Sequence, residues 1–262
     1  MNDVMIGVAM DVLEGARRWR PGLEAEPLAP LLDRLFEESD ASHAALDALL
    51  AQTPPDEQRR LLRSREAYAE LYHRLRDFAL PVSRETGRLL YMLARQLGAA
   101  RGAQACVVEF GTSFGISTLH LAAGLRDGAA LADRADSGSL LAGRGRVITT
   151  EFEAAKAARA RAHLHEAGLL PWVELREGDA LQTLARDLPP RIDLVLLDGA
   201  KALYPEILAL VQPRLAPGAL VLADNADHCP AYLARVRDAS SGYLSLPVGG
   251  DVELSQWQGA AA

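Results

Sequence analysis

Two stretches, IDLVLLDGA at residues 192–200 and ALVLADN at residues 219–225, decide the fold of this chain. Each is an apolar run that ends in polar side chains: Asp198 follows the first run, and Asp224 and Asn225 follow the second. Short apolar runs of this kind are typical of strands buried on both faces of a parallel sheet. Open α/β sheets bind their ligands just beyond the carboxyl ends of such strands. The sequence therefore predicts a parallel sheet with a polar site at that edge.

The polar side chains after these two runs suit a hard divalent cation. Two carboxylates and an amide offer the oxygen ligands that Mg²⁺ prefers, and they leave positions for water or a substrate hydroxyl. Lys201, three residues after Asp198, could then act on that hydroxyl. Taken singly, Asp-Gly after a strand is a common turn and Asp-Asn a common helix cap. The interpretation depends on both stretches occurring together with the glycine-rich segment described below.

Composition excludes several classes of protein. The 262 residues carry 28 basic and 35 acidic side chains, a net charge of -7, with no sustained basic run. This balance argues against nucleic acid as a partner and favours a small molecule. No apolar stretch approaches the ~20 residues that span a bilayer, and the start MNDVMIGVAMDVLEGARR is unlike a secretory signal. We expect a cytoplasmic protein that does not interact with membranes, with both cysteines reduced.

The first 80 residues predict a helical N-terminal extension. Apolar residues recur at helical spacing between residues 28 and 80, Pro54 and Pro55 interrupt the pattern, and Pro81 ends it. A further helix is expected over residues 83–97, ended by Gly98. The domain organisation is thus an extension, residues 1–80, followed by one domain, residues 81–262. The extension is expected to cover the site as a lid or to form the interface of a homodimer.

Beyond residue 103, strand and helix patterns alternate. Strands are expected in ACVVEF, GRVITTE, WVELRE and the two opening stretches, with helices over 116–125, 154–167, 203–215 and from residue 181. This alternation predicts right-handed βαβ units and a doubly wound, mostly parallel α/β sheet. GYLSLPV and DVELSQW, separated by two glycines, predict a C-terminal antiparallel hairpin. Residues 127–145 are interpreted as an insertion with a short helix at its centre.

The segment VVEFGTSFGIST, residues 107–118, joins the first strand to a helix through Gly111 and Gly115. Glycines there permit a tight turn and close approach of the backbone to a ligand. Their spacing differs from the G-x-G-x-x-G of nicotinamide enzymes, which lowers the case for a dehydrogenase. Glu151 ends the second strand, where a carboxylate can accept both hydroxyls of a ribose. Asp179, after the third strand, either accepts from an adenine amine or caps the next helix.

From about residue 81 onward, the chain resembles the class I S-adenosylmethionine-dependent methyltransferases, and more narrowly the cation-dependent O-methyltransferases like catechol O-methyltransferase. PVSRETG resembles the family's cofactor-lid segment, VVEFGTSFGIST its first motif, and CPAYLARVR the helix after the metal site. The resemblance implies a seven-stranded sheet, S-adenosylmethionine as cofactor, and Mg²⁺ or another divalent cation. The cofactor-binding residues that it implies are Val82, Ser83, Glu109, Gly111, Gly115, Ser117, Glu151, Asp179, Ala180 and Asp198. It also implies Asp198, Asp224 and Asn225 as metal ligands and Lys201 as the catalytic residue.

The expected reaction is methylation of a hydroxyl on a small, aromatic acceptor with a vicinal oxygen. A bound cation lowers the pKa of a coordinated hydroxyl, and Lys201 either takes its proton or stabilises the oxyanion. Two departures from the family pattern argue against a simple catechol. Gly199 and Ala200 replace bulky residues, which predicts a wider pocket. The loop between the last two strands, Pro247 to Gly250, lacks the acid that holds the second hydroxyl.

Three alternatives stay open from the sequence. A class I methyltransferase of a small metabolite could keep these acids for the cofactor and bind no metal. A nicotinamide-dependent dehydrogenase is disfavoured by the glycine spacing and by the lack of a Tyr-x-x-x-Lys pair near the sheet. A binding or assembly protein could retain the fold without catalysis, since the apolar faces of the extension exceed what the core needs.

Overall fold

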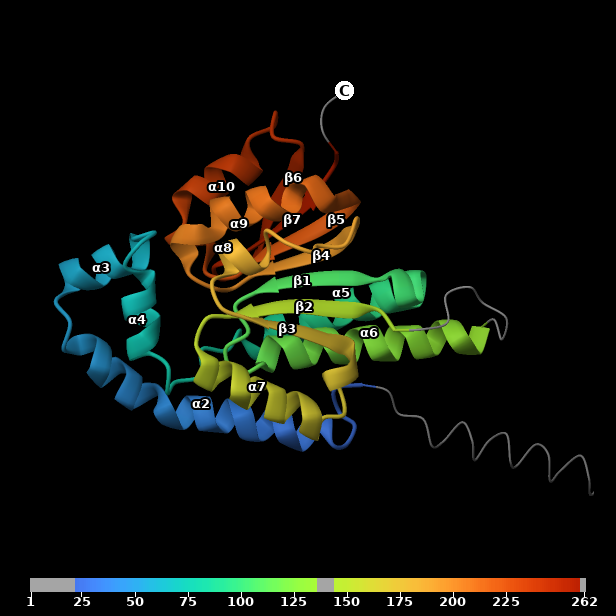
Figure 1. Cartoon of the computed structure of the whole chain (residues 1–262), viewed down its shortest axis with the longest axis horizontal. Coiled ribbons are helices and arrows are strands. Elements are labelled where there is room, and N and C mark those ends of the chain that lie inside the picture. The colour runs from blue at the N-terminus through green and yellow to red at the C-terminus, as the bar shows by residue number, and fades with distance from the viewer. Residues whose placement is uncertain (1–21, 136–143, 260–262) are drawn as a thin grey trace, which may run out of the picture.

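The computed structural model describes residues 22–135 and 144–259 (Figure 1). Seven strands form one sheet in the order β3-β2-β1-β4-β5-β7-β6. These strands are β1 (Cys106–Phe110), β2 (Arg146–Glu151), β3 (Val173–Glu177), β4 (Ile192–Leu197), β5 (Leu215–Ala223), β6 (Tyr243–Gly249) and β7 (Val252–Trp257). The first five pair in parallel, whereas β7 pairs antiparallel with both β5 and β6. The predicted fold class, including the C-terminal hairpin, is confirmed.

Both faces of the sheet are covered, which explains the continuous apolar strands. Along β1, Val107 joins one apolar cluster while Cys106, Val108 and Phe110 join another, because successive side chains of a strand point to opposite faces. The first cluster packs against α5 (Arg84–Arg101), α6 (Ile116–Ala135) and α7 (Ala154–Glu166). The second packs against α8 (Ala180–Thr183), α9 (Tyr204–Val211) and α10 (Pro230–Arg237). This two-sided packing fixes the strand ends that position the site.

In the described part of the chain, three helices precede α5. The long helix α2 (Leu28–Ala51) runs along the molecule beside α7, and α3 (Pro55–Arg63) and α4 (Tyr68–Arg74) stand at one side (Figure 1). Four α2 leucines and Phe36 are buried in the same cluster as α5 and α6. A smaller cluster of Leu61, Leu71 and Leu75 holds α3 and α4 together. The apolar faces of this N-terminal region are therefore packed largely within the chain.

Several predicted helix ends are wrong. Gly98 does not end a helix but lies inside α5, which continues to Arg101, and Gly102 with φ +50° follows it. A Cβ on Gly98 would lie 2.4 Å from the carbonyl oxygen of Leu125, so this glycine serves close helix packing. Helix α4 ends at Arg74, and α9 ends at Val211, earlier than predicted.

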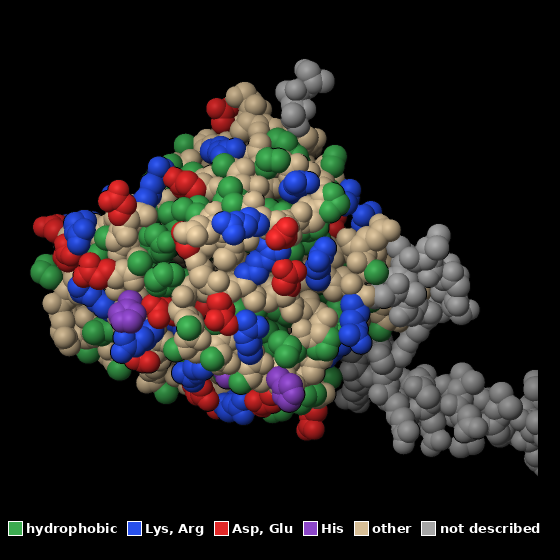
Figure 2. All heavy atoms as spheres, viewed as in Figure 1, with side chains coloured by type: hydrophobic (Ala, Val, Ile, Leu, Met, Phe, Trp, Pro, Cys, Tyr) green, Lys and Arg blue, Asp and Glu red, His purple; other side chains and the backbone are tan. Residues whose placement is uncertain are grey.

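The predicted insertion is also revised. Its first part continues α6 as far as Ala135 instead of forming a separate short helix, and residues 136–143 lie outside the described residues. The start of the chain, used above for the signal-peptide argument, lies outside them too. Among the described helices, none is long and apolar enough to cross a membrane. Basic and acidic side chains are interspersed on the face in Figure 2.

Candidate active site

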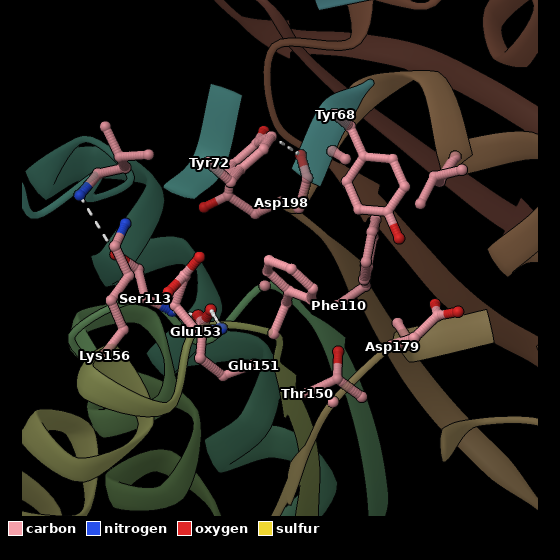
Figure 3. Close-up of a pocket in the computed structure, with 18 residues that line it drawn as sticks. Tyr68, Tyr72, Phe110, Ser113, Thr150, Glu151, Glu153, Lys156, Asp179 and Asp198 are labelled. Carbon is pink, nitrogen blue, oxygen red and sulfur yellow. Dashed lines mark hydrogen bonds between the residues drawn. The ribbon is translucent and has the colours of Figure 1, made fainter. Parts of the chain in front are cut away.

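A pocket with about 640 Å³ of empty space lies between α4 and the carboxyl ends of the parallel strands (Figure 3). Its walls come from the ends of β1, β2 and β4, the turn after β3, and helices α4 and α7. The lining residues are Tyr68, Tyr72, Leu80, Phe110, Gly111, Ser113, Thr150, Glu151, Phe152, Glu153, Lys156, Gly178, Asp179, Ala180, Asp198, Gly199, Ala200 and Leu203.

The turn after β1 requires its two glycines. Gly111 has φ +106°, and a Cβ there would lie 2.7 Å from the backbone of Asp198. Gly115 has φ +88°, and a Cβ would lie 3.2 Å from the Cβ of Ala160 on α7. Both positions therefore disfavour any other residue. The close approach of Gly111 to Asp198 brings the first and fourth strand ends together at the pocket floor.

Glu151 lies at the end of β2, where it faces the pocket (Figure 3). Its carboxylate accepts hydrogen bonds from the backbone N–H of Ser113, at 2.7 Å, and of Glu153, at 2.8 Å. Burial raises the pKa of Glu151, while these backbone donors and Lys156 oppose the shift. Asp179 both lines the pocket and caps α8, accepting from the N–H of Leu181 at 2.9 Å. The two interpretations of Asp179 are thus compatible.

Asp198 and Lys201 form a buried ion pair beside the pocket. The Lys201 ammonium donates to Asp198 Oδ1 at 2.8 Å, and both side chains are 10% exposed. Burial lowers the pKa of Lys201, but Asp198 and the nearby Tyr204 and Tyr72 raise it more, so the net shift is well upward. Lys201 also lies 5.5 Å from the centre of the Tyr204 ring. In this arrangement Lys201 carries a proton and a positive charge.

The second strand end of the predicted metal site holds Asp224 and Asn225. Burial raises the pKa of Asp224 to about 7, and the neighbouring Asp198 adds to this shift. Asn225 has a left-handed backbone, φ 47° and ψ 43°, and its Nδ2 donates to Asp251 Oδ2 at 2.6 Å. Within residues 22–135 and 144–259, no group of three or more His, Cys, Asp or Glu side chains is placed to hold a metal ion.

Two expectations about the acceptor side are wrong. The loop between β6 and β7 does contain an acid, because β6 extends to Gly249 and β7 begins at Val252, which leaves Asp251 in the loop next to Asn225. Nor does Gly199 widen the pocket. A Cβ on Gly199 would lie 2.5 Å from the Phe110 ring, so that ring occupies the space which a bulky residue would otherwise fill.

The predicted cofactor residues fall into two sets. Five line the pocket: Gly111, Glu151, Asp179, Ala180 and Asp198. The other five, Val82, Ser83, Glu109, Gly115 and Ser117, do not.

Among these five, Ser83 caps α5 by accepting from the N–H of Thr86 at 3.0 Å, and Val82 is buried. Glu109 is fully buried behind the turn, where its carboxylate accepts from the hydroxyls of Ser117, at 2.6 Å, and Thr118. In this structure, Glu109 and Ser117 stabilise the turn after β1.

The sequence did not indicate the side of the pocket that α4 forms. Tyr68 and Tyr72, one turn apart on α4, line the pocket, and Phe152 and Lys156 line its β2 side. The Tyr68 ring meets the Phe152 ring edge-on at 6.3 Å between centroids. The i, i+4 spacing of the two tyrosines places them on one helix face, but the sequence alone does not say what that face covers.

A parallel sheet with a glycine turn after β1, an acid after β2 and polar groups after β4 and β5 defines an α/β domain built to hold a nucleotide-like cofactor. Residues 108–226 match a family described as "Methyltransferase domain". This segment of the chain is therefore similar to known methyltransferase domains.

Two curated relatives and a solved structure are similar to the chain. Catechol O-methyltransferase of Niastella koreensis is 31% identical over 150 residues, which are 56% of this chain and 58% of that protein. Catechol O-methyltransferase of Mycobacterium tuberculosis is 33% identical over 165 residues, 62% of this chain and 64% of that protein. The chain thus matches less than two thirds of the length of either relative.

The O-methyltransferase TomG from Streptomyces achromogenes, solved in complex with S-adenosylmethionine, is 27% identical with a TM-score of 0.54. That likeness covers 76% of this chain and 92% of TomG. The resemblance to class I S-adenosylmethionine-dependent O-methyltransferases is confirmed by these similarities.

Proposed function

We propose that this protein is an S-adenosylmethionine-dependent O-methyltransferase that uses a divalent cation and acts on a hydroxyl of a small aromatic molecule. The observation that carries the proposal is that Glu151, Asp179 and Asp198 line the same pocket, within the segment that matches methyltransferase domains. TomG, a related O-methyltransferase, binds S-adenosylmethionine, and the two curated relatives are catechol O-methyltransferases.

The residues present fit the predicted cofactor. Glu151, held by two backbone donors, can accept from ribose hydroxyls, and Asp179 can accept from an adenine amine beside Phe152. Gly111 lets the turn after β1 lie directly against the backbone of Asp198 at the edge of this pocket. Val82, Ser83, Glu109, Gly115 and Ser117 support this site from outside the pocket. Lys156, buried on the same side of the pocket, adds a positive charge near Glu151.

The donor set of the predicted metal site also fits a hard cation. Asp198 and Asp224 are carboxylates whose pKa values are raised first by burial, and Asp198 raises the pKa of Asp224 further, which is a pattern that a cation relieves. The bond from Asn225 Nδ2 to Asp251 leaves Asn225 Oδ1 available as a third oxygen ligand. When bound, the cation supplies Lewis acidity toward the acceptor hydroxyl and S-adenosylmethionine supplies the methyl group.

Lys201 then acts as an electrostatic residue. Asp198 keeps Lys201 protonated, so Lys201 is better suited to stabilise a developing oxyanion than to accept the proton of the acceptor hydroxyl. Asp251 supports an acceptor with a vicinal oxygen, since its carboxylate lies beside Asn225 and can accept from a second hydroxyl. A cytoplasmic location and a homodimer through the N-terminal helices stay predictions. Sedimentation of the whole chain would test the dimer.

The activity is tested with a panel of catechols, flavonoids and hydroxylated amino acids. We expect methyl transfer in Mg²⁺, loss of transfer in excess chelator, and recovery when Mg²⁺ is restored. Lys201→Met should lower kcat by about 100-fold, the cost of removing one preorganised charge from a transition state. Activity that persists in chelator would instead favour the metal-independent methyltransferase. No transfer to any acceptor would contradict the proposed reaction.

The metal site is tested separately by calorimetric titration with Mg²⁺. Asp224→Asn removes a charged ligand and should weaken Mg²⁺ binding by at least tenfold. The matched control is Asp227→Asn, three residues away on an exposed side chain, which should bind Mg²⁺ as the wild type does. Equal Mg²⁺ affinity in both variants would exclude Asp224 as a ligand.

A further inference from the structure

The turn that carries Asp198 and Lys201 is held between two aromatic side chains. From β1, the Phe110 ring packs against Gly199 so closely that a Cβ there would lie 2.5 Å from the ring. From α4, the Tyr72 hydroxyl donates to the carbonyl oxygen of Gly199 at 3.1 Å. Gly199 is the residue directly after Asp198 and two before Lys201. The backbone between the two site residues therefore touches both the sheet and the N-terminal helices.

The contact from above comes from a residue 127 positions away in the chain. Tyr72 lines the pocket, and burial raises the pKa of its phenol, so the hydroxyl stays protonated as a donor. Other contacts hold the same helices in place. His73 Nδ1 pairs with Glu153 at 3.1 Å, and Arg65 pairs with Glu206, in the first turn of α9, at 2.8 Å.

We propose that Tyr72 is a positioning residue for the proposed methyl transfer: its hydrogen bond to Gly199 fixes the Asp198–Lys201 turn when α4 covers the pocket. The inference rests on the proposed function for its kinetic consequence only. The hydroxyl touches backbone rather than the reacting atoms, so it acts through Asp198 and Lys201. Covering the pocket and aligning the catalytic lysine are then one event, because the same helix does both.

A purely space-filling role for Tyr72 predicts a different result from a positioning role. If Tyr72 only filled space, its ring would suffice, and Tyr72→Phe would behave as the wild type. If its hydroxyl positions the turn, Tyr72→Phe should lower kcat by about two- to tenfold, the range expected for one lost hydrogen bond. The affinity for S-adenosylmethionine, measured by calorimetry, should change by less than about twofold, because the ring still covers the pocket.

A second measurement needs no turnover. Amide hydrogen exchange in residues 198–204 should accelerate in Tyr72→Phe, since the turn loses its tie to α4. The matched control is Tyr91→Phe, which removes another tyrosine hydrogen bond, to Asp127 at 2.8 Å, outside the pocket. We expect Tyr91→Phe to leave both kcat and exchange in residues 198–204 at wild-type values.

The outcomes separate this inference from the proposed function. Unchanged exchange in residues 198–204 of Tyr72→Phe would overturn the positioning role, whatever the enzyme's activity. So would an unchanged kcat, or an equal acceleration of exchange in Tyr91→Phe. A wild type that methylates no acceptor would contradict the proposed function alone, and the exchange measurement would still decide the role of Tyr72.

Discussion

Glu109 shows that a residue in a ligand-binding sequence motif can have a structural position in the folded protein. It lies on the first motif, yet its carboxylate faces Ser117 and Thr118 in the interior. Burial raises its pKa to about 7, against hydrogen bonds from three hydroxyls. The folded protein therefore holds this proton up to about pH 7, whereas the unfolded chain releases it near its ordinary 4.5. Glu109 thus stabilises the fold most below pH 4.5, and this contribution is lost as pH rises to 7.

This sign gives the residue-scale prediction. As pH rises from 4 to 8, the wild type loses the stability that protonated Glu109 contributes, and Glu109→Gln does not. The decrease in the free energy of unfolding over this range should therefore be smaller in Glu109→Gln than in the wild type, by roughly 2–3 kcal/mol. Asp224 and Glu151 also titrate with raised pKa values, but they do so in both proteins and cancel. Urea unfolding at several pH values measures the difference, with exposed Glu37→Gln as the control. Parallel pH curves for wild type and Glu109→Gln would show that Glu109 is not the group responsible.

At this scale, the sequence reveals residues that strand ends bring together and hides those that tertiary packing brings together. Asp198 and Asp224 follow neighbouring parallel strands, so their proximity could be predicted from the apolar runs before them. Phe110 beside Gly199, and Tyr72 above it, come from distant segments. The prediction for Gly199 fails for this reason, because its surroundings depend on Phe110, which no local pattern specifies. The acid in the last loop is missed for another reason: β7 begins at Val252, so the loop includes Asp251.

Helices and strands differ in how well local sequence marks them. The central strands β1 and β4 are short, largely apolar runs, the outer strands alternate with polar residues, and all seven strands overlap the predicted stretches. Helix ends are marked less well, and for α5 the reason is a glycine that resembles a stop signal. Gly98 lies inside α5 because α6 passes too closely for a side chain, and Gly124 and Gly128 of α6 meet α5 in the same way. A glycine chosen for helix contact and one chosen for a helix end look alike in sequence.

The element-scale prediction uses this contact. In an open helix, replacing glycine by alanine stabilises by about 1 kcal/mol. In α5 the sign should reverse, because the Cβ of Gly98→Ala would meet Leu125 O at 2.4 Å and Ala129 N at 3.0 Å. We expect a loss of about 2–3 kcal/mol in the free energy of unfolding, typical of overpacking. The control is Ala100→Gly, at an exposed position of the same helix, which should lower the free energy of unfolding by no more than about 1 kcal/mol. A stabilised Gly98→Ala would show that α5 and α6 are not so close.

At the scale of the whole molecule, the N-terminal helices belong to two separate apolar clusters. Helix α2 shares its apolar cluster with α5 and α6, while α3 and α4 form a small cluster of their own above the pocket. The sequence predicted an extension and a domain as separate regions, because their textures differ. It could not show that α2 completes the body's core, since apolar helical spacing says which face is buried and not against what.

This division predicts two different responses to core truncation. Leu35 on α2 is 1% exposed and packs in the shared cluster, so Leu35→Ala should lower the stability of the whole chain by about 2–5 kcal/mol. Because the cluster is shared, calorimetry should show one transition that moves to lower temperature as a unit. Leu71 on α4 is 5% exposed but packs in the small cluster with Leu61 and Leu75. Leu71→Ala should therefore loosen mainly α3 and α4, with faster amide exchange there and a smaller shift of the main transition. If Leu35→Ala instead gave a separate low-temperature transition and left the main one in place, α2 would be an appendage, and the body would fold without it.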